Sequence, residues 1–218
     1  MPECRGCGKD VALIGGRVKV HGCPEDYARW DDEEGFRHER ESRFTDPRKD
    51  CPHPERWHAA DADSTEDEVT DLVAAFVRAL RPDIVVETGS AWGRTAFAIG
   101  DVIGGGTLYT IEPNGERAAA TRNRCGGMRV EVIEKPSLDW DPVDGIGFAW
   151  LDSLLDLRAA EFRHLYPHFA PGAFVGFHDT GPHRQALRDQ IEALEAEGLL
   201  LPVFLPTPRG VCFAEVVR

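Results

Sequence analysis

From residue 84 onward, short apolar runs alternate with amphipathic stretches, and this alternation most limits what the chain can fold into. The pattern predicts strands over 84–88, 107–112, 129–133, 146–151 and 173–178. It predicts helices over 93–103, 115–124, 156–168 and 183–197. Because parallel neighbouring strands need crossover connections, strands that alternate with helices predict a mostly parallel sheet with helices on both faces.

The end of the chain has a different pattern. LPVFL at 201–205 and VCFAEVV at 211–217 are separated only by PTPRG, which is too short for a crossover. We therefore expect an antiparallel hairpin that completes a doubly wound, seven-stranded α/β sheet. A further helix is expected to begin at Ser64 or Thr65, where STEDE offers a capping residue followed by an acid, and to end at Pro82.

The first 60 residues differ from the rest, since they are rich in Cys, His, Pro and charge and show no sustained apolar period. A length of 218 residues suits one domain with an appendage. We therefore divide the chain into a Cys/His-rich segment with a charged linker, 1–60, and a single α/β domain, 61–218.

Charge and hydropathy limit the binding partners and the cellular location that we expect for this protein. The net charge of −13 repels phosphate backbones, so we expect no nucleic-acid partner. No run approaches the roughly 20 apolar residues that span a bilayer. The start, MPECRGCGKD, lacks the apolar core of a secretory signal. We expect a cytoplasmic protein without membrane contact, and a homo-oligomer is compatible with the sequence.

The cysteines of the first segment have the spacing of a metal site. CRGCG has the form of a zinc knuckle, and VKVHGC supplies two more ligand types. We predict a structural zinc bound by Cys4, Cys7, His21 and Cys23, with Cys51 or His53 from KDCPHPE as alternates for one of them. Redox chemistry of the C-x-x-C pair and unliganded thiols are the other interpretations.

A glycine-containing turn, ETGSAWG, follows the first predicted strand and leads into a helix. Gly89 allows a tight turn and the close approach of a ligand, and Gly93 lets the helix pack near the strand. Glu112 ends the next predicted strand, where a carboxylate can accept hydrogen bonds from both hydroxyls of a ribose. The turn departs from the G-x-G-x-x-G of dinucleotide sites. Its acid, Glu87, would repel a pyrophosphate but suits a ligand with an ammonium and a sulfonium.

Four motifs, ETGSAWGRTAFAI, LYTIEPN, FAWLDS and PGAFVGFHDT, resemble in their order and spacing those of the class I S-adenosylmethionine-dependent methyltransferases. More narrowly, the chain resembles the small-molecule O-methyltransferase-like group, which includes cephalosporin-hydroxylase-type and macrocin-type enzymes, over about 64–218. The resemblance implies S-adenosylmethionine as the cofactor. The cofactor-binding residues that it implies are Glu87, Gly89, Ser90, Gly93, Glu112 and Ser137.

Three polar residues follow the fourth and fifth predicted strands. Asp152, His178 and Asp179 are expected at the same sheet edge as the glycine turn. In metal-dependent relatives these places hold carboxylate ligands for magnesium, so we predict a divalent ion, Mg or Mn, at these three residues. The histidine departs from that pattern and suits manganese, iron or zinc better. In the alternatives, His178 acts as a general base, or the two aspartates only cap the following helices.

These expectations favour methyl transfer to a hydroxyl of a small molecule. A neutral alcohol, as in a sugar or a glycosylated natural product, is a poor nucleophile that needs help from a metal or from His178. Two other functions stay open. One is a metal-dependent hydroxylase-like enzyme on the same fold, and the other is a non-catalytic nucleoside-binding or zinc-containing interaction protein.

Overall fold

The computed structural model describes residues 13–14, 17–19, 38–39, 57–58, 64–181 and 184–218. The strands of the large sheet are β4 Ile84–Thr88, β5 Thr107–Ile111, β6 Val130–Ile133, β7 Ile146–Leu151, β8 Phe169–His178, β9 Leu200–Leu205 and β10 Val211–Val216. The helices are α2 Asp67–Leu80, α3 Arg94–Val102, α4 Gly115–Arg124, α5 Arg158–Leu165 and α6 Gln185–Ala196. Two 3₁₀ turns, η3 Ser137–Asp139 and η4 Tyr166–His168, complete the domain.

The strands form one seven-stranded sheet in the order β6-β5-β4-β7-β8-β10-β9. β4 to β8 pair in parallel, whereas β10 pairs antiparallel with both β8 and β9. The predicted doubly wound sheet and its terminal hairpin are therefore confirmed. The strand order reverses between β4 and β7, and in such sheets ligands bind at the carboxyl ends of the strands beside the reversal.

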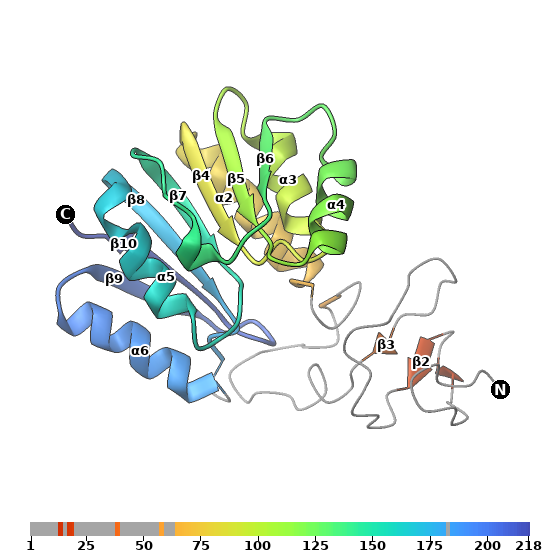
Figure 1. Ribbon diagram of the computed structural model, residues 1–218. Coiled ribbons are helices and arrows are strands. Elements are labelled where there is room, and N and C mark those ends of the chain that lie inside the picture. Colours follow the sequence, from red (N-terminus) through yellow and green to blue (C-terminus); the bar gives the residue numbers. More distant parts are fainter. Residues whose placement is uncertain (1–12, 15–16, 20–37, 40–56, 59–63, 182–183) are drawn as a thin grey trace.

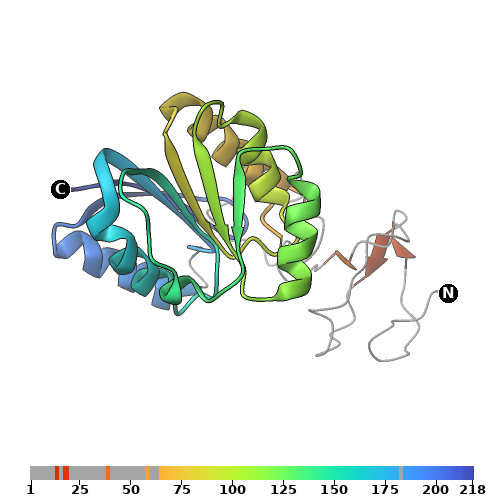
Figure 2. The ribbon, with the colours of Figure 1, turned by 45° about the horizontal axis from the view of Figure 1, so that its top comes forward.

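Helices cover both faces of the sheet (Figures 1 and 2). α5 and α6 lie on one face, where Phe162 and Ile191 pack into a core with the side chains of β7, β8 and β10. α2 and α3 lie on the other face, where Val73 and Ile99 pack against β4 and β7. Each of these fully buried apolar side chains stabilises the domain by about 1.5–3 kcal/mol relative to exposure.

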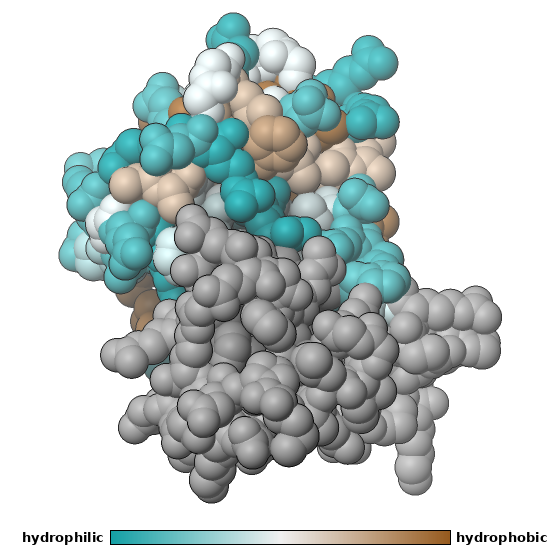
Figure 3. Space-filling model, turned by 90° about the vertical axis from the view of Figure 1, so that its right-hand side faces the viewer, coloured by the Kyte–Doolittle hydropathy of each residue, from teal (hydrophilic) through white to brown (hydrophobic). Residues whose placement is uncertain are grey.

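The exposed side chains of α4 are mainly polar. In the part of this side that Figure 3 draws in colour, hydrophilic residues surround several hydrophobic patches. The reason is the composition of α4, whose side chains at Glu116, Arg122 and Arg124 are exposed. This helix buries little beyond Ala118 and Thr121, so it adds a thin cover to its end of the sheet.

Two elements differ from their predicted bounds. α2 begins at Asp67 rather than at Ser64 or Thr65, and Glu66 at its N-cap makes no side-chain cap hydrogen bond. The helix predicted over 156–168 is shorter as α5, and its last turn becomes η4. Pro167 explains this change, because it has no N–H to donate within the helix.

The first part of the chain is described only in short pieces. β1 Leu13–Ile14, β2 Arg17–Lys19 and β3 His38–Glu39 form a small sheet in the order β1-β2-β3. All six predicted zinc ligands and alternates, Cys4, Cys7, His21, Cys23, Cys51 and His53, lie outside the described residues. Among the described residues, every helix is too short or too polar to cross a bilayer.

Candidate functional site

A cavity of about 770 Å³ lies at the carboxyl ends of the strands, at the point where the strand order reverses. Its size is within the range of small-molecule sites. We call the part at the ends of β4, β5 and β6 the β5 half; Gly89, Glu112 and Ser137 line it. We call the part at the ends of β7 and β8, with the β9–β10 loop and the start of α6, the β8 half.

The β5 half begins with the turn between β4 and α3. Gly89 and Gly93 have φ angles of 80° and 75°, which favour glycine. A Cβ at Gly89 would lie 2.6 Å from the carbonyl oxygen of Asp152, so no larger residue fits between the ends of β4 and β7. At Gly93 a Cβ would meet the side chain of Thr121 in α4 at 2.8 Å. The two glycines thus bring the turn close to its neighbours.

Glu112 is held by the backbone. One carboxylate oxygen accepts a hydrogen bond from the N–H of Ala91 and the other from the N–H of Asn114, both at 3.0 Å. Each oxygen keeps a further lone pair for an outside donor. The carboxylate lines the cavity in a fixed orientation and can accept two hydroxyl hydrogen bonds, as a ribose would require.

Glu87 lies beneath the turn rather than in the cavity. Its side chain is 1% exposed and accepts a hydrogen bond from the hydroxyl of Thr110. Burial outweighs this hydrogen bond and raises the pKa of Glu87 to about 8, with smaller contributions from Asp152 and Glu112. The side chain is therefore mostly uncharged at pH 7. Within the described part of the chain, Ser90 and Gly93 are likewise absent from the cavity lining, so three of the six expected cofactor residues shape the turn from below.

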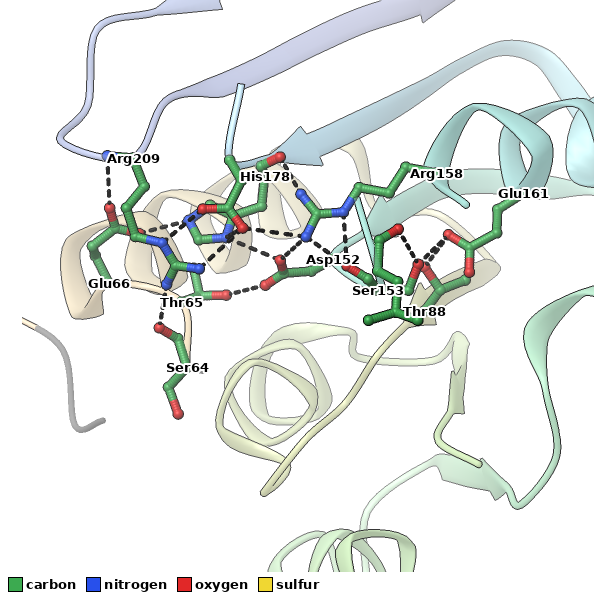
Figure 4. Close-up of polar contacts among 12 residues, drawn as sticks. Ser64, Thr65, Glu66, Thr88, Asp152, Ser153, Arg158, Glu161, His178 and Arg209 are labelled. Carbon is green, nitrogen blue, oxygen red and sulfur yellow. Dashed lines mark hydrogen bonds and ion pairs between the residues drawn. The ribbon is translucent and has the colours of Figure 1, made fainter. Parts of the chain in front are cut away.

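Ser137 lines the β5 half and donates a hydrogen bond to Glu161 of α5. Glu161 is buried and also accepts hydrogen bonds from Thr88 at 2.9 Å and Ser153 at 2.7 Å (Figure 4). One carboxylate thus joins the ends of β4 and β7 to η3. This role of Glu161 was not expected from the sequence, because an acid in the first turn of a helix is ordinarily a solvated residue that interacts favourably with the helix dipole.

Asp152, His178 and Asp179 lie together in the β8 half, with one ligand-type atom from each within 4.8 Å of the others. His178 is fully buried, and its Nδ1 lies 3.0 Å from the carboxylate of Asp152. Its Nε2 lies 2.6 Å from the carboxylate of Glu66 (Figure 4). Because ionised carboxylates only accept hydrogen bonds, both ring nitrogens donate and the ring is an imidazolium.

The electrostatics agree with this protonation state. Burial by itself lowers the pKa of His178, but the nearby carboxylates of Asp152, Asp179 and Glu66 outweigh it and raise the pKa to about 9. A ring that is already protonated at neutral pH cannot accept another proton. The geometry therefore does not support the role of His178 as a general base.

Two arginines, Arg158 and Arg209, form hydrogen bonds with the carboxylates of Asp152 and Asp179. Arg158 donates to the carboxylates of Asp152 at 3.0 Å and Asp179 at 3.3 Å. Arg209 binds both oxygens of Asp179, at 2.7 and 3.0 Å, and Thr65 donates to the second oxygen of Asp152 at 2.6 Å. Burial alone raises the pKa of both aspartates. His178 and Arg158 outweigh it at Asp152, and Arg209, His178 and Arg158 outweigh it at Asp179, so the pKa of each is lowered. Neither aspartate caps a helix, since Leu157 and Arg184 hold the N-cap positions of α5 and α6.

We call Glu66, Asp152, Arg158, His178, Asp179 and Arg209 the ion network. It holds three carboxylates, two guanidinium groups and one imidazolium, so its charges balance without a further cation. All four oxygens of the two aspartates already accept from protein donors. Arginine stays protonated in proteins, so a divalent ion here would lie beside two fixed positive charges.

These residues therefore do not fit the predicted Mg or Mn, nor the iron of the hydroxylase alternative. Magnesium and manganese are held by negatively charged carboxylate oxygens, and here two guanidinium groups and the imidazolium already neutralise that charge. The same three residues that the sequence suggested as metal ligands are better described as part of a buried ion network.

Glu66, Arg158 and Arg209 were not expected at this site from the sequence. One signal for Arg209 was available: β10 is antiparallel to β8, so PTPRG must lie at the carboxyl end of β8, where Val211 pairs with His178. Gly210, with a φ of 86°, lets this loop approach closely, since a Cβ there would lie 2.1 Å from the nitrogen of Gly181. Glu66 gave no such signal, because its place before a helix resembles ordinary capping.

The chain matches no protein-family model and no curated protein sequence. It is similar in structure to an O-methyltransferase from Bacillus cereus in complex with SAH, with 18% identity, a TM-score of 0.64, and coverage of 72% of this chain and 84% of that chain. The O-methyltransferase TomG from Streptomyces achromogenes, involved in tomaymycin synthesis and in complex with SAM, gives 17% identity, a TM-score of 0.61, and coverage of 71% and 82%. The SAH-bound methyltransferase PaMTH1 from Podospora anserina gives 15% identity, a TM-score of 0.61, and coverage of 81% of this chain and 87% of that chain. The described α/β domain therefore has the Rossmann-like methyltransferase fold.

Proposed function

We propose that this protein transfers the methyl group of S-adenosylmethionine to an oxygen atom of a small molecule. The observation that carries the proposal is Glu112, whose carboxylate is fixed by two backbone amides beside the turn at Gly89. An acid held in this way at the end of β5 matches the two hydroxyls of a ribose. The solved structures with the same fold, two of which contain SAH and one SAM, support this ligand.

The residues of the β5 half fit the cofactor. Glu112 would hold the ribose, Gly89 would let the ligand approach the backbone, and Ser137 would lie beside the base. When bound, S-adenosylmethionine supplies a methyl group that its sulfonium centre already activates. The chain then needs mainly to align the acceptor with that methyl group and to exclude water.

The ion network suits such a positioning role. It ties the end of β7, the end of β8, the β9–β10 loop and the segment before α2 to one another through buried side chains (Figure 4). A wall fixed by paired charges changes little when a ligand binds, which lowers the entropic cost of aligning two reactants. We therefore assign these residues to the wall of the acceptor site rather than to proton transfer or metal binding.

Calorimetric titration of the full chain with S-adenosylmethionine and S-adenosylhomocysteine tests the proposal. We expect binding to both, with NAD⁺ as a control ligand that binds at least tenfold more weakly, because the turn lacks the third glycine of a pyrophosphate site. No binding of either ligand at millimolar concentration would rule the proposed function out. Release of labelled methyl groups from the bound cofactor to a panel of small acceptors then tests turnover.

A further inference from the structure

The β8 half contains an arginine that the ion network does not use. Arg184 lines the cavity at the start of α6, and its Nε is buried without a hydrogen-bond partner among the residues that the structure describes. A buried donor that stays unsatisfied destabilises the protein, and more so when it is charged. A ligand that supplies an acceptor oxygen would remove this cost.

The charges around Arg184 favour an anionic ligand. Arg158 and Arg209, the other arginines of this half, are already paired with Asp152 and Asp179. The ion network is balanced within itself, so the guanidinium of Arg184 adds one positive charge that no described acid neutralises. The remaining charged lining residues, Glu112, Asp139 and Arg117, lie in the β5 half.

Among its described residues, the β8 half also offers no free group that could take a proton from a neutral alcohol. Both nitrogens of His178 are held by carboxylates and the ring is fully buried, so it has no access to the cavity. Every oxygen of Asp152 and Asp179 already accepts a hydrogen bond from the protein, and the neighbouring cations lower the pKa of both carboxyl groups, which makes them weak bases. An acceptor that has already lost its proton in solution avoids this difficulty.

We propose that the acceptor is an organic anion, a carboxylate or an acidic phenolate, whose ionised oxygen pairs with Arg184. This inference rests on the proposed methyl transfer and narrows its substrate class. In the transfer, the carbon–sulfur bond of the sulfonium breaks and a carbon–oxygen bond forms with the electron pair of the oxyanion. The products are a neutral thioether and a neutral methyl ester or ether. No proton has to move, which agrees with the lack of a free base among the described residues of the β8 half.

The inference revises the expectation of a sugar hydroxyl. A neutral sugar would leave the Nε of Arg184 unsatisfied unless one of its oxygens happened to reach it. It would also need a proton acceptor that the described β8 half does not provide. An acid needs neither adjustment, and a charge-assisted hydrogen bond to arginine is about twice as strong as a neutral one.

The test is calorimetric titration of the S-adenosylhomocysteine-loaded protein with three probes of similar size: benzoate, 4-nitrophenolate and benzyl alcohol. We expect one or both anions to bind at least about tenfold more tightly than benzyl alcohol, and the ranking of benzoate against 4-nitrophenolate separates carboxylate from phenolate acceptors. Arg184→Gln should abolish the preference and leave the affinity for S-adenosylhomocysteine unchanged. Arg188→Gln, which removes the same charge one turn later in α6 where Arg188 packs on Phe204, should keep the preference.

Equal affinities for the three probes, including no binding by any of them, would overturn the inference. So would a preference for anions that survives in Arg184→Gln. The comparison of probes on the unaltered protein stands even if the variant unfolds. Failure of S-adenosylhomocysteine itself to bind is a different result, because it contradicts the proposed function rather than the choice of acceptor.

Discussion

The two halves of the cavity are built in different ways. In the β5 half, backbone amides orient Glu112 and glycines shape the turn, and all of these groups lie within 89–114 of the chain. In the β8 half, side chains from segments far apart in sequence form the ion network; the hydrogen bond between Glu66 and His178 spans 112 positions. The first half depends on local chain geometry and the second on the complete tertiary fold.

This difference has an energetic consequence. Backbone hydrogen bonds remain when one side chain is changed, whereas each member of a buried ion network neutralises its neighbours. Removing one partner of a buried ion pair leaves an uncompensated charge and typically costs 3–5 kcal/mol. Substitutions should therefore reduce stability most in the β8 half and reduce ligand binding most in the β5 half.

The largest expected effect is that of Arg209→Met. The change leaves the carboxylate of Asp179 without its bidentate partner and removes the hydrogen bond to the carbonyl of Ser64. We expect the free energy of unfolding, measured with urea at pH 7, to fall by about 3–5 kcal/mol. Arg163→Met is the matched control, because it breaks an exposed pair with Glu197 that should add little stability.

A loss in Arg209→Met no larger than that in the control would contradict the comparison between the halves. A double variant sharpens it. Asp179→Asn in the Arg209→Met background removes the excess negative charge that the loss of Arg209 leaves in the ion network, so it should recover part of the stability. If the double variant is as unstable as the sum of the two single variants, the two side chains do not act as a pair.

The second prediction concerns the acid beneath the β5 half. The pKa of Glu87 is raised from its ordinary value of 4.5 to about 8, so the folded state holds a proton that the unfolded state releases. The stabilisation by the protonated form is complete below about pH 4.5 and is lost as the pH rises toward 8. Glu87→Gln removes this dependence. Relative to the original protein, the variant should gain about 3 kcal/mol in unfolding free energy between pH 5 and pH 8.

Urea unfolding at several pH values measures this gain. The hydroxyl of Thr110 stabilises the ionised carboxylate and so lowers the pKa of Glu87. Thr110→Val removes this hydroxyl and should therefore raise the pKa of Glu87 further. In that variant the loss of stability should extend to higher pH. Parallel pH profiles for Glu87→Gln and the original protein would show that Glu87 is ionised in the folded state.

The same contrast explains how far the sequence could be interpreted. The strands, their alternation with helices and the terminal hairpin could be predicted from hydrophobic periodicity. The turn at Gly89 and the acid at Glu112 could be predicted from local spacing. The partners of His178 could not be found in this way. The sequence does not show that Glu66 and Arg209 reach the end of β8. Two aspartates and a histidine at one sheet edge were therefore interpreted as a metal site. In this chain the positive charge beside the two aspartates comes from the guanidinium groups of Arg158 and Arg209.

The third prediction tests the glycine turn. Gly89→Ala would place a Cβ 2.6 Å from the carbonyl oxygen of Asp152 at a φ of 80°. Strain of this kind costs of order 1–3 kcal/mol, and the turn should also move away from the ligand. We expect weaker binding of S-adenosylhomocysteine by about tenfold or more in calorimetry. Gly105→Ala is the control, since a Cβ there meets open space. Equal affinities of the two variants for S-adenosylhomocysteine would show that the turn at Gly89 does not contribute to binding of this ligand.

The smallest change in structure is Glu112→Gln, and it tests the β5 half most directly. A glutamine keeps one oxygen for either Ala91 or Asn114 and turns an NH₂ group toward the other backbone N–H, so one of two amides loses its acceptor. The same substitution halves the acceptor capacity offered to a ribose. We expect the affinity for S-adenosylhomocysteine to fall about tenfold, which corresponds to about 1.4 kcal/mol.

Glu116→Gln, an exposed acid on α4 close in sequence, is the control for this loss of charge and should bind as the original protein does. The pair of variants separates two causes. A general loss of negative charge near the cavity would weaken binding of the positively charged S-adenosylmethionine in both variants. Loss of a ribose contact would weaken binding only in Glu112→Gln, and equally for S-adenosylmethionine and S-adenosylhomocysteine, because both carry the same ribose. Unchanged affinity in Glu112→Gln would mean that the backbone-held carboxylate does not contact the nucleoside, and the assignment of the β5 half to the cofactor would fail with it.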